Sequence, residues 1–240
     1  MNEKKLKPLG SAGSVFYFGI PALLLYTATH LGIPLLHQWT GLPAIVCWYI
    51  GGGFLVFLPM FIASFIFIKK EGINLNFREP AKRFRLDRFS SGILLLSISG
   101  IIATAGLTYL MLIIGRHFYT DFSAQPSFMQ LKPLQVGKMW ILATWIPMFI
   151  FNILGEGLYW RGTIFPRQEL VLEDNTWLVH GFFWLLFHLP FGWYLMLTLI
   201  PIIFITAFLV QVTRSTWPDI IIHTVINGSG FLLVAFGIVT

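Results

Sequence analysis

From residue 175 to residue 213 the chain contains no Asp, Glu, Lys or Arg, and residues 139–155 and 220–240 are equally free of them. Uncharged runs of this length are typical of membrane spans, because a helix needs about 20 apolar residues to cross the hydrocarbon core of a bilayer. The whole chain follows the same pattern, with 56% hydrophobic and 11% charged residues. A soluble globular domain carries more charge than this. We therefore expect an integral membrane protein.

Apolar runs between turn residues and charged residues predict about seven spans. These cover residues 14–37, 43–68, 91–115, 138–160, 177–190, 193–212 and 219–239. The fifth span is too short to cross a bilayer alone, and the sequence PFGW that begins at Pro190 predicts a kink or tight turn before the sixth. The expected fold is all-α, a multi-pass transmembrane helical bundle in which residues 1–240 form a single membrane domain.

The basic residues predict the orientation of the chain in the membrane. If alternate loops share a side, one side holds the N-terminus together with residues 69–90, 161–176 and 213–218. Of the 16 Lys and Arg residues, the opposite side keeps only Arg116, Lys132 and Lys138. We therefore expect a cell-membrane protein with a cytoplasmic N-terminus and an external C-terminus.

The segment 69–89 is the most strongly charged part of the chain. A basic loop beside a span fixes the orientation and attracts anionic lipids, so we expect this segment to contact the anionic headgroups of the bilayer. Because the basic residues of the chain lie in loops between spans, they fit membrane topology. Nucleic acid is not an expected partner.

One carboxylate follows directly after an uncharged run. Glu156 lies in NILGEGLYWRG, residues 152–162, together with Arg161. A charge at membrane depth costs roughly 3 kcal/mol or more, so such residues usually face a protein interior or a water-filled cavity and carry function. Arg161, five residues later, does not share a face with Glu156 on a regular α-helix. It fits either an interfacial arginine that snorkels to the cytoplasmic side or a residue that supports a site.

Three further polar groups, His188, His223 and Asn227, lie in the last apolar spans. His223 and Asn227 are four residues apart and therefore share a helix face. At 1.5 Å per residue, His188 lies about 16 Å from the end of its span, against about 6 Å for His223 and about 7 to 8 Å for Glu156. The three share a cavity only if the helix that carries His188 begins below the interface or tilts. His180, eight residues before His188, is a candidate supporting residue.

These residue types fit two kinds of hydrolytic site. Glu156, His188 and His223 match the His₂Glu set that binds zinc and leaves one position open for water. Without metal, the carboxylate and one imidazole take a proton from water, while Asn227 and the other imidazole donate hydrogen bonds to a developing oxyanion. Residue types alone do not separate the two, so zinc stays a candidate cofactor. The single cysteine, Cys47, adds neither a disulfide nor a Cys-based metal site.

The same residues resemble the motifs of the CAAX-protease and bacteriocin-processing family of intramembrane proteases. EGLYWRG (156–162) resembles the EExxxR motif, WLLFH (184–188) resembles FxxxH, and HTVIN (223–227) resembles HxxxN. The resemblance covers roughly residues 140–235. It implies a helical membrane protease whose core helices enclose a polar cavity.

The resemblance also implies a role for each of the four polar residues. Glu156 and His188 would activate the attacking water, and His223 and Asn227 would stabilise the tetrahedral intermediate. Both metalloprotease and metal-free glutamate mechanisms are argued for this family. The chain departs from the motifs at two positions, because Gly157 stands in place of the second Glu and Trp184 in place of the Phe.

The expected function is therefore an intramembrane endopeptidase that acts on a membrane-associated or lipidated peptide. Prenylated CAAX proteins, leader peptides of bacteriocins or pheromones, and tails of membrane proteins all fit the family. One alternative is a non-catalytic membrane protein that uses the same fold to bind a partner, which the missing carboxylate at Gly157 keeps open. A second is a proton-coupled transporter, because intramembrane Glu and His also build proton relays.

Overall fold

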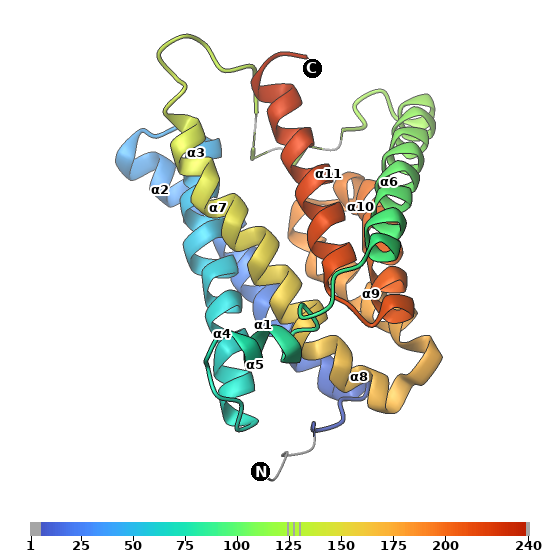
Figure 1. The fold of residues 1–240 in the computed structure, drawn as a ribbon. Coiled ribbons are helices and arrows are strands. Elements are labelled where there is room, and N and C mark those ends of the chain that lie inside the picture. Colours follow the sequence, from blue (N-terminus) through green and yellow to red (C-terminus); the bar gives the residue numbers. More distant parts are fainter. Residues whose placement is uncertain (1–5, 124, 127, 130, 239–240) are drawn as a thin grey trace.

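The computed structural model describes residues 6–123, 125–126, 128–129 and 131–238, and all regular elements within these ranges are helices (Figure 1). A helix suits a span because it satisfies the hydrogen bonds of its own backbone, which lipid cannot do. In chain order the elements are α1 (Ser11–Thr27), η1 (Ala28–Gly32), α2 (Ile33–Thr40), α3 (Ala44–Gly51), η2 (Gly52–Phe57), α4 (Leu58–Lys70), α5 (Arg78–Arg83), α6 (Ser91–Phe118), α7 (Ile141–Glu156), η3 (Gly157–Ile164), α8 (Phe165–Leu172), η4 (Glu173–Asn175), α9 (Thr176–Phe187), η5 (Leu189–Phe191), α10 (Trp193–Thr213) and α11 (Trp217–Ala235).

Six helical stretches of the described chain are long and apolar enough to cross a membrane. They confirm the predicted multi-pass helical bundle. One stretch, Ile141–Phe187, is 47 residues long and contains both the fourth and the fifth predicted span. Within it the chain runs from α7 through the π-helix η3 into α8, turns back at Glu173 and returns as α9 (Figure 1).

The turn expected at the PFGW sequence is present between α9 and α10. It consists of the short 3₁₀-helix η5 and of Gly192, whose φ of 87° lies in the left-handed region that a residue without a Cβ adopts without strain. α9 has only 12 residues. This agrees with the prediction that the fifth span is too short to cross a bilayer alone.

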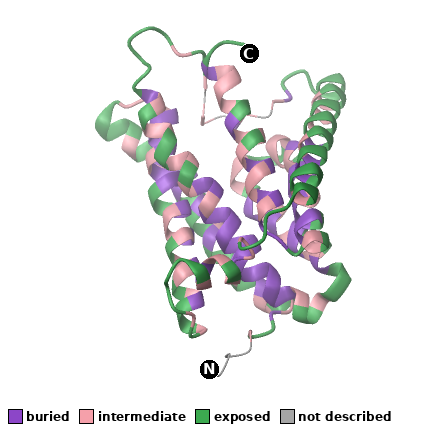
Figure 2. Ribbon diagram, viewed as in Figure 1, coloured by how far each residue is buried: buried purple, intermediate pink, exposed green. Residues whose placement is uncertain are grey.

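The helices form two groups that meet at the centre of the bundle. In the first group α7 packs against α4 and η2, and in the second α10 packs against both α6 and α9. α11 packs against α6 and α10 and also contacts α7, while α1 contacts α9, so both helices connect the groups. Figure 2 shows that buried residues gather around η3 and α8, whereas α6 exposes much of its surface. All eight residues of η3 are buried.

Segments that are distant in sequence meet at one end of the bundle, where α5 and α8 lie (Figure 1). Glu71 pairs with Arg83 at 2.6 Å and with Arg167 at 2.5 Å. Glu169 pairs with Arg85 and, at 2.8 Å, with Arg214. These ion pairs join the segment after α4, helix α8 and the α10–α11 turn.

The same end also holds the beginning of α1, because the backbone N–H of Leu9 donates to the carbonyl oxygen of Arg167 at 3.0 Å. The charge pattern predicts all four of these segments to lie on one side of the membrane, and they do lie at one end of the molecule. Lys4 and Lys5, on which that prediction also rests, lie outside the described residues. Several charged residues of the segment 69–89 therefore form ion pairs within the protein.

Candidate active site

Four of the predicted site residues surround one side chain, Trp184 on α9. The indole Nε1 donates a hydrogen bond of 2.6 Å to Oε2 of Glu156, which ends α7. The Trp184 ring lies 5.7 Å from the ring of His188 and 5.9 Å from that of His223, measured between centroids. The guanidinium carbon of Arg161 lies 4.1 Å from the centroid of the same indole. Residues from α7, η3, the end of α9 and α11 therefore converge on Trp184.

Glu156 is 2% exposed, and each of its oxygens accepts a hydrogen bond. The second donor is Nδ2 of Asn152, one turn earlier on α7, at 2.6 Å from Oε1. Asn227 on α11 donates in turn to Oδ1 of Asn152 at 3.4 Å. The fifth predicted residue thus reaches Glu156 through Asn152. Asn152 is not predicted from the sequence, although a polar residue four positions before Glu156 in an apolar run is a usable signal.

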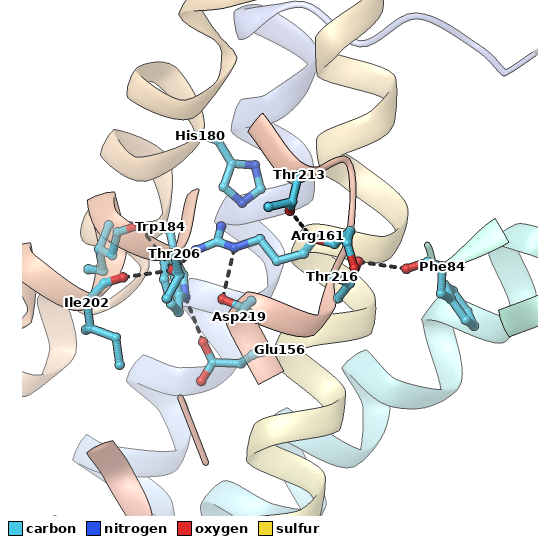
Figure 3. A network of polar contacts seen from close by, with 12 residues as sticks. Phe84, Glu156, Arg161, His180, Trp184, Ile202, Thr206, Thr213, Thr216 and Asp219 are labelled. Carbon is cyan, nitrogen blue, oxygen red and sulfur yellow. Dashed lines mark hydrogen bonds and ion pairs between the residues drawn. The ribbon is translucent and has the colours of Figure 1, made fainter. Parts of the chain in front are cut away.

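Arg161 is completely buried, so the interpretation that it snorkels to the interface is wrong. Its Nε lies 3.1 Å from Oδ1 of Asp219, and its Nη2 donates to Oγ1 of Thr206 at 2.9 Å (Figure 3). The assumption of a regular α-helix failed because Gly157–Ile164 is a π-helix. Its hydrogen bonds run from i to i+5, which brings residues five apart onto one face. Arg161 therefore contacts Trp184, as Glu156 does.

Asp219 lies next to the glycine that replaces the second Glu of the motif. A Cβ at Gly157 would lie 3.4 Å from Oδ2 of Asp219 and 3.3 Å from Cγ1 of Ile220. Asp219 is 1% exposed and belongs to the first turn of α11. The carboxylate of Asp219 on α11 therefore lies beside position 157, where the EExxxR motif has its second Glu.

Neither Asp219 nor Thr206 is predicted from the sequence as a site residue. For Asp219 a signal was available, since it is a carboxylate four residues before His223 on the same helix face. Thr206 gives no such signal. Its hydroxyl donates to the carbonyl oxygen of Ile202 in α10, as hydroxyls within apolar helices commonly do.

The hydrogen bond of His188 fixes its tautomer. Nδ1 lies 2.8 Å from the carbonyl oxygen of Trp184. Because a carbonyl oxygen only accepts, Nδ1 carries the proton and Nε2 of the neutral ring presents a lone pair. Nδ1 of His223 is buried and has no hydrogen-bond partner among the described residues. Both imidazoles therefore keep one ring nitrogen for a further interaction.

His180, the candidate supporting residue, belongs to a buried polar chain that ends beside the site. Its Nδ1 lies 2.6 Å from Oε1 of Gln168, whose Nε2 donates to Oγ of Ser14 at 2.8 Å. Nδ1 is therefore the protonated nitrogen, and Nε2 is a buried acceptor. Nε2 of His180 and Nη1 of Arg161 both lack a partner within the described part of the chain, and in the view of Figure 3 the ring of His180 lies above the Arg161 side chain, whereas Asp219 lies below it. One is an acceptor and the other a donor, so the two atoms are chemically complementary.

The three candidate zinc ligands do not form a metal site in this arrangement. Among the described residues, no group of three or more His, Cys, Asp and Glu side chains is arranged to hold a metal ion. The donor set therefore does not fit zinc as the residues stand, and the chemistry below uses the side chains alone.

Residues 138–229 match the family model described as type II CAAX prenyl endopeptidase Rce1-like. The match includes Glu156, His188, His223 and Asn227 and confirms the family resemblance of the three motifs. It begins just before α7 and ends within α11, so α1 to α6 lie outside it. No curated protein and no solved structure matches the chain.

Proposed function

We propose, from the match of residues 138–229 to the family model described as type II CAAX prenyl endopeptidase Rce1-like, that the protein is an intramembrane endopeptidase. It hydrolyses a peptide bond of a membrane-associated or lipidated peptide. The observation that carries the proposal is the meeting of Glu156, His188 and His223 around Trp184, although the three come from α7, the end of α9 and α11. A purely structural role does not require two imidazoles and a carboxylate around one buried side chain.

Glu156 and His188 activate the attacking water in this proposal. An ionised carboxylate has about four lone-pair sites, and Asn152 and Trp184 use two of them, so Glu156 keeps acceptor capacity for a water molecule. Nε2 of His188 is the second available acceptor. As the water oxygen bonds to the scissile carbonyl carbon, its proton passes to this pair. The same proton goes to the peptide nitrogen when the C–N bond breaks.

His223 and Asn227 stabilise the oxyanion that forms on the carbonyl oxygen. The support for His223 is its buried Nδ1, which no described residue engages. The support for Asn227 is the length of its bond to Asn152, 3.4 Å, which leaves its amide weakly held. Donors of this kind, fixed in a water-poor interior, commonly contribute several kcal/mol to transition-state stabilisation.

Asp219 is a positioning residue in this scheme. It holds Arg161, which in turn covers the face of Trp184, and Trp184 orients Glu156. Its place beside Gly157 supports the view that α11 supplies the carboxylate that the EExxxR motif carries at its second position. The departure of the chain from the motif at Gly157 is then a relocation of this carboxylate.

The substrate class and the orientation are part of the proposal. A prenylated CAAX peptide is the first substrate to test, and leader peptides of bacteriocins or pheromones are the next, since both fit the family. The end of the bundle that holds α5 and α8 faces the cytoplasm, together with the N-terminus. The C-terminus is external.

The test is cleavage of a quenched fluorescent prenylated peptide by the purified protein in detergent, for the wild type and for Glu156→Gln. We expect Glu156→Gln to lose turnover, because an amide does not take up the proton of water at neutral pH. The matched control is Glu173→Gln, which removes an exposed carboxylate between α8 and α9 and should leave turnover unchanged. Turnover retained in Glu156→Gln would contradict the assignment, and the same assay with a chelator tests the zinc alternative.

A further inference from the structure

A groove and a pocket meet on the outside of the bundle, along the seam between α6 and α10. The groove has a volume of about 350 Å³, and its lining is almost entirely apolar, including Leu96, Gly100 and Ala103 of α6 and Trp177, Phe204 and Phe208 of α9 and α10. The pocket, of about 640 Å³, lies at the beginning of α6, between the segment that follows α5 and the end of α10. Leu96 lines both. The two spaces therefore border the same side chain and lie next to each other along α6.

The pocket carries more positive charge than its acidic neighbours neutralise. Four basic residues line it, namely Lys82, Arg85, Arg88 and Arg214, together with a single carboxylate, Asp87. Arg85 and Arg214 share one partner, Glu169, and Arg88 reaches Asp87 only at 3.9 Å with a side chain that is 90% exposed. Lys82 has no ion pair among the described residues.

A second observation also points to an anion in this pocket. Nη1 of Arg85 is buried and has no hydrogen-bond partner among the residues that the structure describes. The first turn of α6 also faces the pocket through Ser90, Gly92 and Ile93. The N–H of Ile93 already donates to Oγ of Ser90 at 3.2 Å, and the other N–H groups that begin a helix attract negative charge. Guanidinium groups and helix N-termini both suit the oxygens of a phosphate.

The depths of the two spaces match the two parts of a phospholipid. The pocket lies at the first turn of α6, whereas the groove begins at Leu96 and reaches Ala103, about 9 to 20 Å along the helix from Ser90. In a bilayer the headgroup lies at the interface and the acyl chains extend inward from it. A phosphate in the pocket would therefore direct its acyl chain into the groove, against the rings of Trp177, Phe204 and Phe208.

We propose that this seam binds an anionic phospholipid, with its headgroup phosphate in the basic pocket and one acyl chain in the apolar groove. The positive charge of the pocket selects the anionic headgroup over a zwitterionic one. Because the apolar groove adjoins the pocket at Leu96, the seam favours an intact lipid over free phosphate. The bound lipid contacts Lys82 of α5, Arg88 in the segment that follows α5, and Arg214 of the α10–α11 turn. It therefore connects these segments on the outer surface of the bundle. The proposal is independent of proteolysis, because its readout is binding.

The test compares lipid retention by the protein in nanodiscs of phosphatidylcholine with and without phosphatidylglycerol, measured by native mass spectrometry. Lys82→Gln/Arg88→Gln removes two exposed charges of the pocket and leaves the ion pairs of Glu169 intact. We expect this variant to retain phosphatidylglycerol about thirtyfold more weakly, since each of the two basic residues near an anionic headgroup contributes about 1 kcal/mol. The matched control, Lys69→Gln/Arg78→Gln, removes the same charge from exposed positions outside the pocket and should retain the lipid as the wild type does.

A variant of the groove separates the lipid from other anions. Ala103→Leu fills the groove from an exposed position of α6. This variant should retain phosphatidylglycerol more weakly than the wild type. Glycerol phosphate, which has no acyl chain, should compete for the basic pocket as well as it does in the wild type. Equal loss in the pocket variant and its control would overturn the proposal in favour of general surface charge. Unchanged lipid retention in Ala103→Leu would also overturn the proposal. So would a groove that binds the peptide substrate instead, which would be seen if a prenylated peptide displaced the lipid and Ala103→Leu no longer cleaved that peptide.

Discussion

At the scale of single residues, the indole N–H of Trp184 distinguishes this site from one with the Phe of the motif. A phenyl ring is smaller than the indole and packs less fully against the two histidines and Arg161, and it donates no hydrogen bond. The bond from Trp184 to Glu156 is buried, so its loss leaves a carboxylate oxygen short of one partner, at a cost of about 1–3 kcal/mol.

We therefore expect Trp184→Phe to lower kcat by about tenfold or more while KM changes little, because no group proposed to contact the substrate is removed. The measurement is the steady-state kinetics of peptide cleavage. Trp177→Phe, on the same helix but in the outer groove, is the control and should keep its kcat. An unchanged kcat in Trp184→Phe would show that the N–H group is not needed.

The carboxylate of Asp219 gives a second test at this scale. Asp219→Ala leaves the Arg161 charge buried without its partner, which costs about 3–5 kcal/mol of stability. Gly157→Glu/Asp219→Ala returns a carboxylate to the same space from η3, four residues before Arg161. We expect the double variant to recover much of the thermal stability and of the cleavage rate that Asp219→Ala loses.

Gly157→Glu alone should be unfavourable, since it places two carboxylates side by side. The three variants form a double-mutant cycle with a favourable coupling energy. If the double variant is no better than Asp219→Ala in stability and in rate, the relocation of the carboxylate is not the explanation for Gly157.

At the scale of helices, the site depends on a close crossing between α7 and η2. A Cβ at Gly155 would lie 2.5 Å from the carbonyl oxygen of Phe57, which is a backbone atom that cannot turn away. The crossing positions Glu156, the next residue, against its neighbours. Small residues commonly allow helices in membranes to approach in this way.

Gly155→Ala should therefore separate α7 from η2 and lower the stability of the fold by about 1–3 kcal/mol. Thermal unfolding in detergent, followed by circular dichroism, measures the effect. Gly106→Ala on α6 is the matched control, because its Cβ would meet nothing within 4 Å. The control should be neutral or slightly stabilising, as alanine favours a helix, and equal midpoints for the two variants would contradict the role of the crossing.

The spans were predictable from the sequence because lipid imposes long uncharged runs, and most of the observed helices begin and end close to the predicted limits. The fourth span is the exception, because η3 and α8 continue the helix to Leu172 through residues predicted as a loop. The sequence predicted that Glu156, His188 and His223 share one cavity only if the helix that carries His188 begins below the interface or tilts. The position at which α9 begins is not readable from the sequence. The π-helix η3 was not predictable, because the sequence carries no signal for its change of hydrogen-bond register. Its consequence was the wrong interpretation of Arg161. Thr206 also escaped prediction, since it acts through a contact between α10 and η3. Asp219 was missed although it lies four residues before His223 on the same helix face.

At the scale of the whole molecule, Glu71 connects three segments through Arg83 and Arg167. Burial by itself would raise the pKa of Glu71, but the hydrogen bonds and charges of the two arginines together lower the pKa of this carboxyl below its usual range. A carboxyl group with a lowered pKa stabilises the fold fully above its unfolded pKa of about 4.3, and this contribution is lost as the pH falls through the lower folded pKa.

We expect Glu71→Gln to lower the melting temperature at neutral pH, with a difference from the wild type that shrinks below about pH 4. Thermal melts over a pH series in detergent measure it. Glu79→Gln on α5, a carboxylate with no ion pair among the described residues, should show little effect at any pH. A melting difference that does not depend on pH would mean that Glu71 acts by packing and not by charge.

The origin of the site residues has a consequence for how the protein is made. Asp219, His223 and Asn227 all belong to α11, the last helix of the described chain to be synthesised. Thr216 holds the turn that begins this helix, because its Oγ1 donates to the carbonyl oxygen of Phe84 at 2.7 Å. Phe84 is synthesised long before Thr216. A chain still emerging from the ribosome therefore lacks His223 and Asn227, half of the four residues proposed to carry out the cleavage. The proposed site is complete only when the final span has entered the membrane, so the proposed activity requires that last step of insertion.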